Sequence, residues 1–176
     1  MISYVFVLVL GVASLFSCCT VSCLRGIDLE QRVTGHLELA ASANQPGLAV
    51  AELRAAVTGM NADIAACDEP HRCYTSVLWK TPAEDVGFWK ANIIATIADL
   101  EALPPDADHL VVSNVLLKVR DTLTEQGNGG TRLVGPTGLW KYPHNGAFAL
   151  WALGSALAVV VGLFGSIAFA MKRGIL

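Results

Sequence analysis

The sequence has few charged residues, and two long stretches have none. Only 15% of its 176 residues are Asp, Glu, Lys or Arg. Residues 2–24 carry no charge, and neither do residues 147–171, which also lack proline and asparagine. These uncharged stretches of 23 and 25 residues exceed the roughly 20 residues with which an α-helix crosses a bilayer. The scarcity of charge therefore argues against a wholly soluble chain and predicts two transmembrane helices.

The sequence also lacks the short motifs of common catalytic and cofactor sites. It contains no Gly-x-Ser-x-Gly elbow, no His-Glu-x-x-His pair, no calcium loop and no haem attachment pair. The glycine-rich stretch 127–130 lacks the Lys-Ser/Thr of a phosphate-binding loop and is interpreted as a helix terminator. With 15 acidic against 12 basic residues, the chain lacks the positive charge of a nucleic-acid-binding protein. These absences predict a protein that is not an enzyme and that has no cofactor and no nucleic-acid partner.

The second uncharged stretch contains a regular pattern of small residues. Five of them recur at every fourth position: Gly154, Ala158, Gly162, Ser166 and Ala170. In lipid, small side chains at this spacing let two helices approach closely. We expect this stripe to be a helix-packing surface. Its partner is a second copy of the chain, the chain's own first span or a different integral membrane protein.

The first uncharged stretch ends at Arg25 and leaves three interpretations open. A retained anchor is favoured, because no Lys or Arg precedes the stretch and because its 23 residues exceed the roughly 7–15 apolar residues of a signal peptide. A cleaved signal sequence is the first alternative. A lipoprotein signal with the modified thiol at Cys18 is the second.

The orientation of the two spans rests on opposing signals. The two basic residues after the second span favour a cytoplasmic C-terminus, whereas Arg25 and Lys141, near the inner ends of the spans, favour a cytoplasmic middle segment. We expect the middle segment to be extracytoplasmic, in the periplasm or a lumen, because a pair formed by Cys67 and Cys73 suits an oxidising compartment. The predicted localisation is thus integral to a membrane, with lipid as a partner and the C-terminus in the cytoplasm.

Apolar residues at helical spacing predict about four amphipathic helices in the middle of the chain. The first three are expected at residues 28–43, 48–66 and 81–103, and the fourth is expected to begin at Asp106 or Asp108 and to end near Glu125. A capping box at Thr81-Pro82-Ala83-Glu84 predicts that the third helix begins at Thr81. Trp89 falls on the apolar face of that helix and is expected in the core.

The predicted fold class is an all-α membrane protein, with two transmembrane helices flanking a small extramembrane bundle of about four amphipathic helices. A short strand at residues 132–134, pairing with residues 76–79, is an alternative for part of the segment after the bundle. The expected parts are an N-terminal transmembrane anchor at 1–25, a helical extramembrane domain at 26–130, an irregular linker at 131–146, a C-terminal transmembrane helix at 147–171 and a short tail at 172–176.

Two of the five cysteines bracket a turn between the second and third predicted helices. Cys67 and Cys73 are six positions apart across a proline-containing turn, which brings a disulfide within reach. Two free thiols are the alternative. A metal site formed by Cys67, His71 and Cys73 is a weaker interpretation, because no second ligand pair stands at a recognised spacing. The other three cysteines lie within the first span and are expected to act as small apolar side chains.

These features favour a non-catalytic accessory or scaffolding subunit. Its C-terminal transmembrane helix is expected to pack against a partner in a larger membrane assembly, either another integral membrane protein or a second copy of the chain. The alternative is an extracytoplasmic ligand-sensing module of four helices, similar in layout to the sensory part of a chemoreceptor but without its own output domain. That similarity is topological, because no residue motif connects the chain with a known family. A redox or metal enzyme is disfavoured, because the cysteine pair lacks Cys-x-x-Cys spacing.

Overall fold

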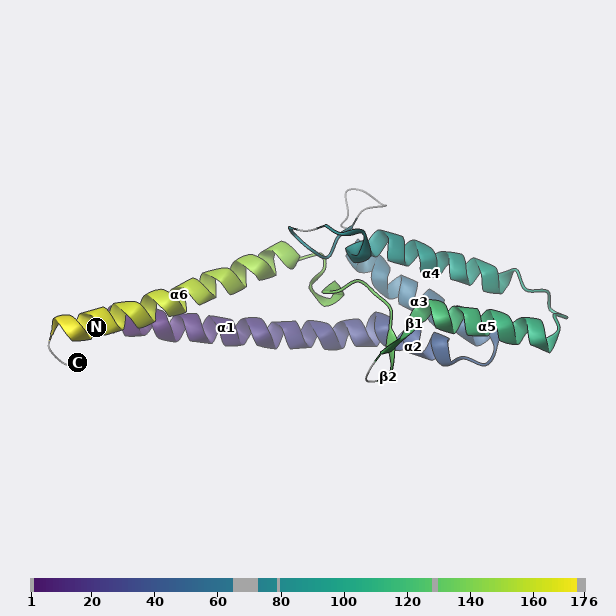
Figure 1. The fold of residues 1–176 in the computed structure, drawn as a ribbon, viewed down its shortest axis with the longest axis horizontal. Coiled ribbons are helices and arrows are strands. Elements are labelled where there is room, and N and C mark those ends of the chain that lie inside the picture. Colours follow the sequence, from purple (N-terminus) through teal and green to yellow (C-terminus); the bar gives the residue numbers. More distant parts are fainter. Residues whose placement is uncertain (1, 65–72, 79, 128–129, 174–176) are drawn as a thin grey trace. The chain divides into compact units, whose positions relative to one another are not determined.

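The computed structural model describes residues 2–64, 73–78, 80–127 and 130–173, which are mostly helical (Figure 1). The chain divides into two compact units. The terminal unit consists of residues 1–25 and 144–176, and the middle unit consists of residues 26–143. Each unit is described in turn.

The terminal unit contains most of α1 (Ile2–Leu29) and all of α6 (Asn145–Lys172). Both helices have the length and apolar composition needed to cross a membrane. At about 1.5 Å per residue, the 28 residues of α6 form a helix longer than a hydrocarbon core of about 30 Å. Most of their large apolar side chains are exposed, including Phe6, Phe16, Leu150 and Phe164. Such exposure is typical of a surface that is covered by lipid or by another protein.

The first helix does not end where its uncharged stretch ends. It continues past Arg25 to Leu29, and the chain remains helical through a π-helical turn, η1 (Glu30–Thr34), and α2 (Gly35–Ser42). The predicted helix at residues 28–43 is therefore continuous with the first span. Arg25 changes the polarity of the sequence, but it is a good helix former and gives the backbone no reason to break.

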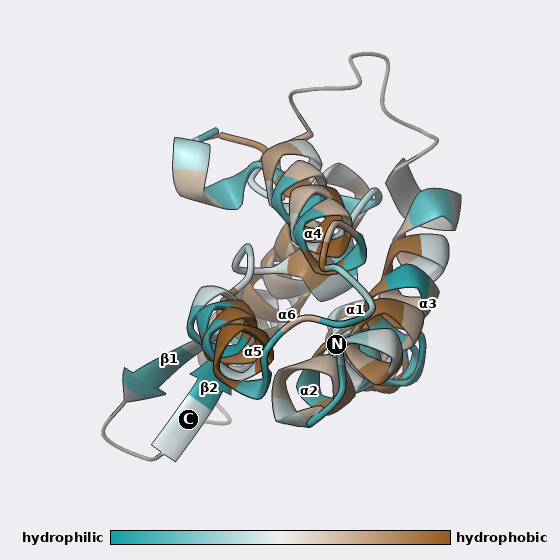
Figure 2. Ribbon diagram, turned by 90° about the vertical axis from the view of Figure 1, so that its right-hand side faces the viewer, coloured by the Kyte–Doolittle hydropathy of each residue, from teal (hydrophilic) through white to brown (hydrophobic). Residues whose placement is uncertain are grey.

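The middle unit packs α2 against α3 (Pro46–Ile64) and α5 (His109–Leu123), and it packs α3 against α4 (Val86–Glu101). Figure 2 shows both apolar and polar segments around these helices, as the amphipathic pattern predicts. Large aliphatic side chains fill the space between them. The most completely buried are Val33, Leu37, Leu53, Val86 and Ile93.

A close backbone contact joins the π-helical turn to α3. A Cβ atom at Gly59 would overlap the carbonyl oxygen of Arg32, so only glycine fits at this position. The wider π turn is also fixed by its own hydrogen bond, from the Gly35 N–H to the Glu30 carbonyl. The contact sets the distance between η1 and α3.

The capping box at Thr81 is present, but it starts a single 3₁₀ turn, η2 (Pro82–Glu84), and α4 begins at Val86. The prediction that the third helix begins at Thr81 is therefore wrong by one turn. Asp85 is the N-cap of α4, and its Oδ1 accepts from the backbone N–H groups of Gly87 (2.9 Å) and Phe88 (3.1 Å). Asp85 stays extended because its backbone pairs with Tyr74 in an antiparallel bridge.

A β-hairpin follows α5. The helix ends at Leu123, and β1 (Thr124–Gly127) pairs with β2 (Gly130–Leu133) in antiparallel register. In the structure the fourth helix thus ends two residues before its predicted end at residue 125. The predicted strand at 132–134 overlaps β2, but its partner is β1 and not residues 76–79. Asn-Gly between two short strands is typical of a hairpin turn, so interpreting residues 127–130 only as a terminator overlooked this signal.

The segment after the hairpin packs on α4 and contains a short 3₁₀ turn, η3 (Leu139–Lys141). The Trp89 indole N–H donates to the Val134 carbonyl at 2.9 Å. A Cβ atom at Gly135 would lie 3.2 Å from the Trp89 ring. Trp89 is half-buried and packs against the core. The segment predicted as an irregular linker thus begins as a strand and covers one side of α4.

Candidate functional sites: helix-packing faces

The two helices of the terminal unit pack in antiparallel orientation. Near one end, Gly165 of α6 faces Tyr4 of α1, and at the other end the Arg25 guanidinium lies 5.6 Å from the centre of the Phe148 ring. Between these contacts, a Cβ at Gly162 would lie 2.6 Å from the Leu8 backbone nitrogen. The helices are therefore close enough that side chains larger than hydrogen do not fit at several contacts.

Gly11 of α1 also lets the two helices approach closely. A Cβ at Gly11 would lie 2.8 Å from the backbone nitrogen of Val159 and 3.1 Å from the Ala158 Cβ. The contacts of Gly11 and Gly162 are reciprocal, because each glycine lies against the backbone of the other helix. Such contacts let dispersion act directly between two backbones.

Polar side chains also join the two helices. The Ser14 and Ser155 hydroxyl oxygens are 2.7 Å apart, and the Trp151 indole N–H donates to the Ser14 hydroxyl at 2.8 Å. Ser155 is buried. In an apolar environment these groups have few other hydrogen-bond partners, so they fix the register of the two helices. No sequence pattern predicted this trio.

The predicted stripe of small residues only partly coincides with this packing face. Gly162 is buried against Leu8, and Ala158 lies at Gly11. Ser166 and Ala170 are half-buried, and the Ser166 hydroxyl donates to the Gly162 carbonyl of its own helix. Gly154 is exposed, and a Cβ there would meet no atom within 4 Å.

The difference follows from helix geometry. A step of four residues turns about 40° beyond a full turn, so a stripe of five such residues winds about 160° around the helix. Many covered positions of α6 instead follow alternating steps of three and four, a seven-residue repeat that drifts only about 20° per heptad. Buried or half-buried residues at this spacing are Asn145, Phe148, Ala152, Ser155, Val159, Gly162, Ser166 and Phe169. Trp151, Ala158 and Gly165, which also contact α1, lie beside this repeat.

A second candidate packing face lies on α4 in the middle unit. One side of this helix is in the core, through Val86, Ile93, Ile97 and Leu100. The opposite side is also apolar, but it is exposed. We define the outer face of α4 by the exposed helix residues Phe88, Ala91, Ala95 and Ala98 and the exposed C-cap Ala102, which follow alternating steps of three and four.

The charged residues beside the outer face are engaged within the chain. Lys90 donates to the Asn61 side chain, Lys118 lies 3.4 Å from Asp99, and Arg54 pairs with Glu101. These exposed pairs contribute little to stability. The charged side chains next to the outer face are thus already paired with an opposite charge or, for Lys90, with an amide.

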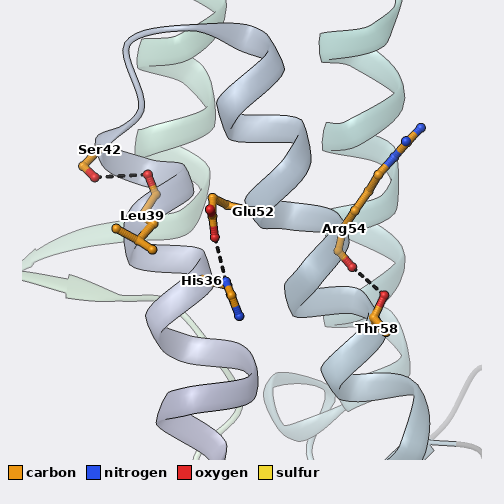
Figure 3. Close-up of polar contacts among 6 residues, drawn as sticks. All are labelled: His36, Leu39, Ser42, Glu52, Arg54 and Thr58. Carbon is orange, nitrogen blue, oxygen red and sulfur yellow. Dashed lines mark hydrogen bonds and ion pairs between the residues drawn. The ribbon is translucent and has the colours of Figure 1, made fainter.

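A polar contact joins α2 and α3 on another side of the unit (Figure 3). His36 Nδ1 lies 2.6 Å from Glu52 Oε2, and both side chains are about one-third exposed. Figure 3 also shows the Thr58 hydroxyl bonded to the Arg54 carbonyl within α3. The hydrogen bond between His36 and Glu52 is a structural contact between neighbouring helices.

The predicted cysteine site falls mainly outside the described residues. Cys67 and His71 lie in the range 65–72, which the structure does not describe. Cys73 is buried, with 4% of its surface exposed, and its backbone N–H donates to Asp85 Oδ1 at 3.2 Å. The disulfide and the metal site both stay predictions. Cys18, Cys19 and Cys23 are free thiols, and the described part of the chain contains no cluster of three metal-ligating side chains.

Comparison of the chain with protein-family models, with characterised proteins and with solved structures finds no match. Function is therefore inferred from the packing faces.

Proposed function

We propose that the chain is a membrane-anchored, non-catalytic accessory subunit. In this proposal α1 and α6 cross the membrane as a helical hairpin, and the middle unit docks onto a partner protein in the same membrane. The main support is the outer face of α4, because a helix that is apolar on two opposite sides is normally covered on both.

The antiparallel pairing of α1 and α6 has a topological consequence for this proposal. If both helices cross the bilayer, residues 2 and 173 lie on one side and the middle unit lies on the other. We propose that the termini are cytoplasmic and the middle unit is extracytoplasmic, where a Cys67–Cys73 disulfide is stable. Labelling of a single cysteine placed at Ser3 or at Asn114, with an impermeant maleimide on intact cells, tests this arrangement in a chain whose other cysteines are replaced.

The C-terminal helix α6 is less suited to contact a partner protein than the sequence suggested. Its heptad-spaced face lies against α1, and large side chains such as Leu150, Leu157 and Phe164 are exposed on its other sides. Large apolar side chains on the remaining sides suit lipid. We therefore assign the partner contact chiefly to the outer face of α4.

The composition of the outer face defines the partner. Four of its five residues are alanine, at a spacing that lets a second helix approach closely. The neighbouring charges Lys90, Asp99 and Glu101 are engaged with the chain's own side chains. The fitting partner is thus an apolar helix of another protein, with small or medium side chains and no charge at the contact.

Photo-crosslinking at one position of this face tests the proposal. A benzoylphenylalanine at position 95 is expected to crosslink one protein in the native membrane, and the same substitution at Asn114, an exposed position of α5, is expected to leave that protein uncrosslinked. Purification in a mild non-ionic detergent should then recover the same protein in fixed ratio with the wild-type chain.

A matched pair of arginine variants completes the experiment. Ala95→Arg places a charge in the centre of the outer face and should release the partner, whereas Asn114→Arg adds the same charge to α5 and should retain it. The proposal is wrong if no protein co-purifies in fixed ratio, or if both variants retain or both lose it while their helical content equals that of the wild type.

A further inference from the structure

A groove in the middle unit lies between α2, α5 and the β-hairpin. Its volume is about 950 Å³, which lies at the upper end of the range of about 300–1,000 Å³ typical of small-molecule sites. From α2 and the turn after it, Glu38, Ala41, Ser42, Ala43 and Asn44 line the groove. The remaining lining residues come from α5 and the hairpin.

One face of α5 forms a wall of this groove. His109, Ser113, Leu116, Leu117 and Arg120 line it, and they recur at helical spacing. His109 and Arg120 are eleven positions apart, which corresponds to about 16 Å along the helix axis. The wall is therefore polar at both ends and apolar in the middle, around Leu116 and Leu117.

A second arginine lines the groove from the hairpin. Arg132 lies on β2, the second strand of the hairpin. The guanidinium of Arg120 has an exposed neighbour, Asp121, at 4.0 Å, and Glu125 stands opposite Arg132 in the strand register. Neither acid lines the groove. An exposed contact at 4.0 Å contributes little free energy, so it does not prevent Arg120 from binding an anion.

The charges of the lining residues select the ligand. Arg120 and Arg132 carry two positive charges and Glu38 carries one negative charge, so these three side chains leave an excess of one positive charge. The whole chain, in contrast, has a net charge of −3. A single carboxylate balances the excess, and its two oxygens match the planar fork of an arginine.

We propose that this groove binds a small amphipathic monocarboxylate. Its carboxylate interacts with Arg120 and Arg132, and its apolar body lies along Leu116 and Leu117. Such a ligand would supply the input that a sensing module requires. The proposal does not rest on the docking role of α4, because the groove and the outer face use different residues.

Titration of the full chain in non-ionic detergent with 4-phenylbutyrate tests this proposal. Calorimetry should detect saturable binding with a dissociation constant of about 1 mM or lower. The uncharged analogue 4-phenyl-1-butanol and the cationic 4-phenylbutylamine have similar apolar bodies. Both should bind at least about tenfold more weakly, because they lack the charge-assisted hydrogen bonds.

Matched variants locate the site. Arg120→Ala and Arg132→Ala should each weaken phenylbutyrate binding about tenfold or more, whereas Lys118→Ala, which removes the same charge from the same turn of α5, should change it less than about twofold. Leu117→Ala should weaken binding about threefold, and Leu110→Ala, at an exposed leucine outside the groove, should leave it unchanged. Arg132→Lys retains the charge and tests the arginine geometry if Arg132→Ala does not fold.

Three results would each overturn the proposal. They are the absence of saturable phenylbutyrate binding, equal binding of phenylbutanol and phenylbutyrate, and an equal loss of affinity in the Lys118→Ala and Arg120→Ala variants. The first result excludes the ligand, the second makes the groove an apolar site without charge selection, and the third assigns the effect to the overall charge of α5.

Discussion

The terminal unit and the middle unit both consist of closely packed helices, but they fill their contacts with different side chains. In the terminal unit, Gly11 and Gly162 bring two backbones together, and a serine pair joins the helices. In the middle unit, large side chains such as Leu37, Leu53 and Ile93 fill the space between the helices.

The difference matches the surroundings proposed for each unit. In water, burying a large aliphatic side chain contributes about 1.5–3 kcal/mol, so helices associate through large residues. In lipid that gain disappears, because a leucine is as well solvated by lipid tails as by another helix. Close backbone contact and hydrogen bonds then hold the helices together. Gly59 is the exception, since it provides a glycine contact inside the middle unit.

The largest effect on stability is expected at Gly59. Gly59→Ala should lower the free energy of unfolding of the middle unit by about 3 kcal/mol, because the new Cβ overlaps the Arg32 carbonyl and one of the two backbones must shift. Gly47→Ala is the matched control on the same helix, where a Cβ meets nothing within 4 Å. That variant should be unchanged or more stable by up to about 1 kcal/mol. Thermal denaturation followed by circular dichroism measures both, and equal stability of the two variants would contradict the close contact.

The next effect tests the glycine contact of the terminal unit. Gly162→Leu should weaken the pairing of α1 and α6 by about 2 kcal/mol, because Leu8 occupies the space that the new side chain needs. Gly154→Leu changes the same helix at a position with no atom within 4 Å and should leave the pairing intact.

Disulfide formation between cysteines at positions 14 and 155 reports this pairing, because the wild-type serine hydroxyls are 2.7 Å apart. The measurement uses a chain in which Cys18, Cys19 and Cys23 are replaced by alanine. Crosslinking should be fast when Gly162 is retained, slower in the Gly162→Leu variant and unaffected by the change at position 154. If Gly154→Leu slows it as much as Gly162→Leu does, the four-residue stripe predicted from the sequence describes the packing better than the heptad face.

A smaller effect is expected at the start of α4. Asp85→Ala should destabilise the middle unit by about 1–2 kcal/mol, because its carboxylate accepts three backbone N–H groups, those of Cys73, Gly87 and Phe88. Thr81→Ala removes the exposed capping box of η2 and should cost about 0.5 kcal/mol. Asp85→Asn retains an acceptor oxygen and should fall between them. Chemical denaturation ranks the three variants, and a larger loss for Thr81→Ala would place the start of the helix where the sequence predicted it.

The helices were predictable because their signals are local. The uncharged stretches located α1 and α6, and apolar spacing located α3 and α5 to within a few residues. The errors occurred where a local signal competed with a distant contact. Thr81 has the better capping motif, but Asp85 begins α4 because its backbone pairs with Tyr74. Likewise Thr124 leaves the helix because it pairs with Leu133.

The candidate sites were less predictable than the helices. The small-residue stripe was predicted from spacing along one helix. In the structure Gly162 packs against Leu8 and Gly154 is exposed, because the covered face also depends on the geometry of the partner helix. The alanine positions on the outer face of α4 stand in the sequence at heptad spacing. Their exposure depends on which side of α4 the core occupies, and the groove between α2, α5 and the hairpin depends on contacts between distant segments.

The sequence by itself determined two apolar helices, several amphipathic helices and the chemical character of each face, because hydrophobic periodicity and chain length are properties of single segments. The tertiary structure decided which faces are covered. It placed Gly162 against Leu8, left the alanines of α4 exposed and assembled a groove with Arg120 and Arg132. The reason is that burial and charge balance belong to pairs of segments, and no single segment specifies its partner.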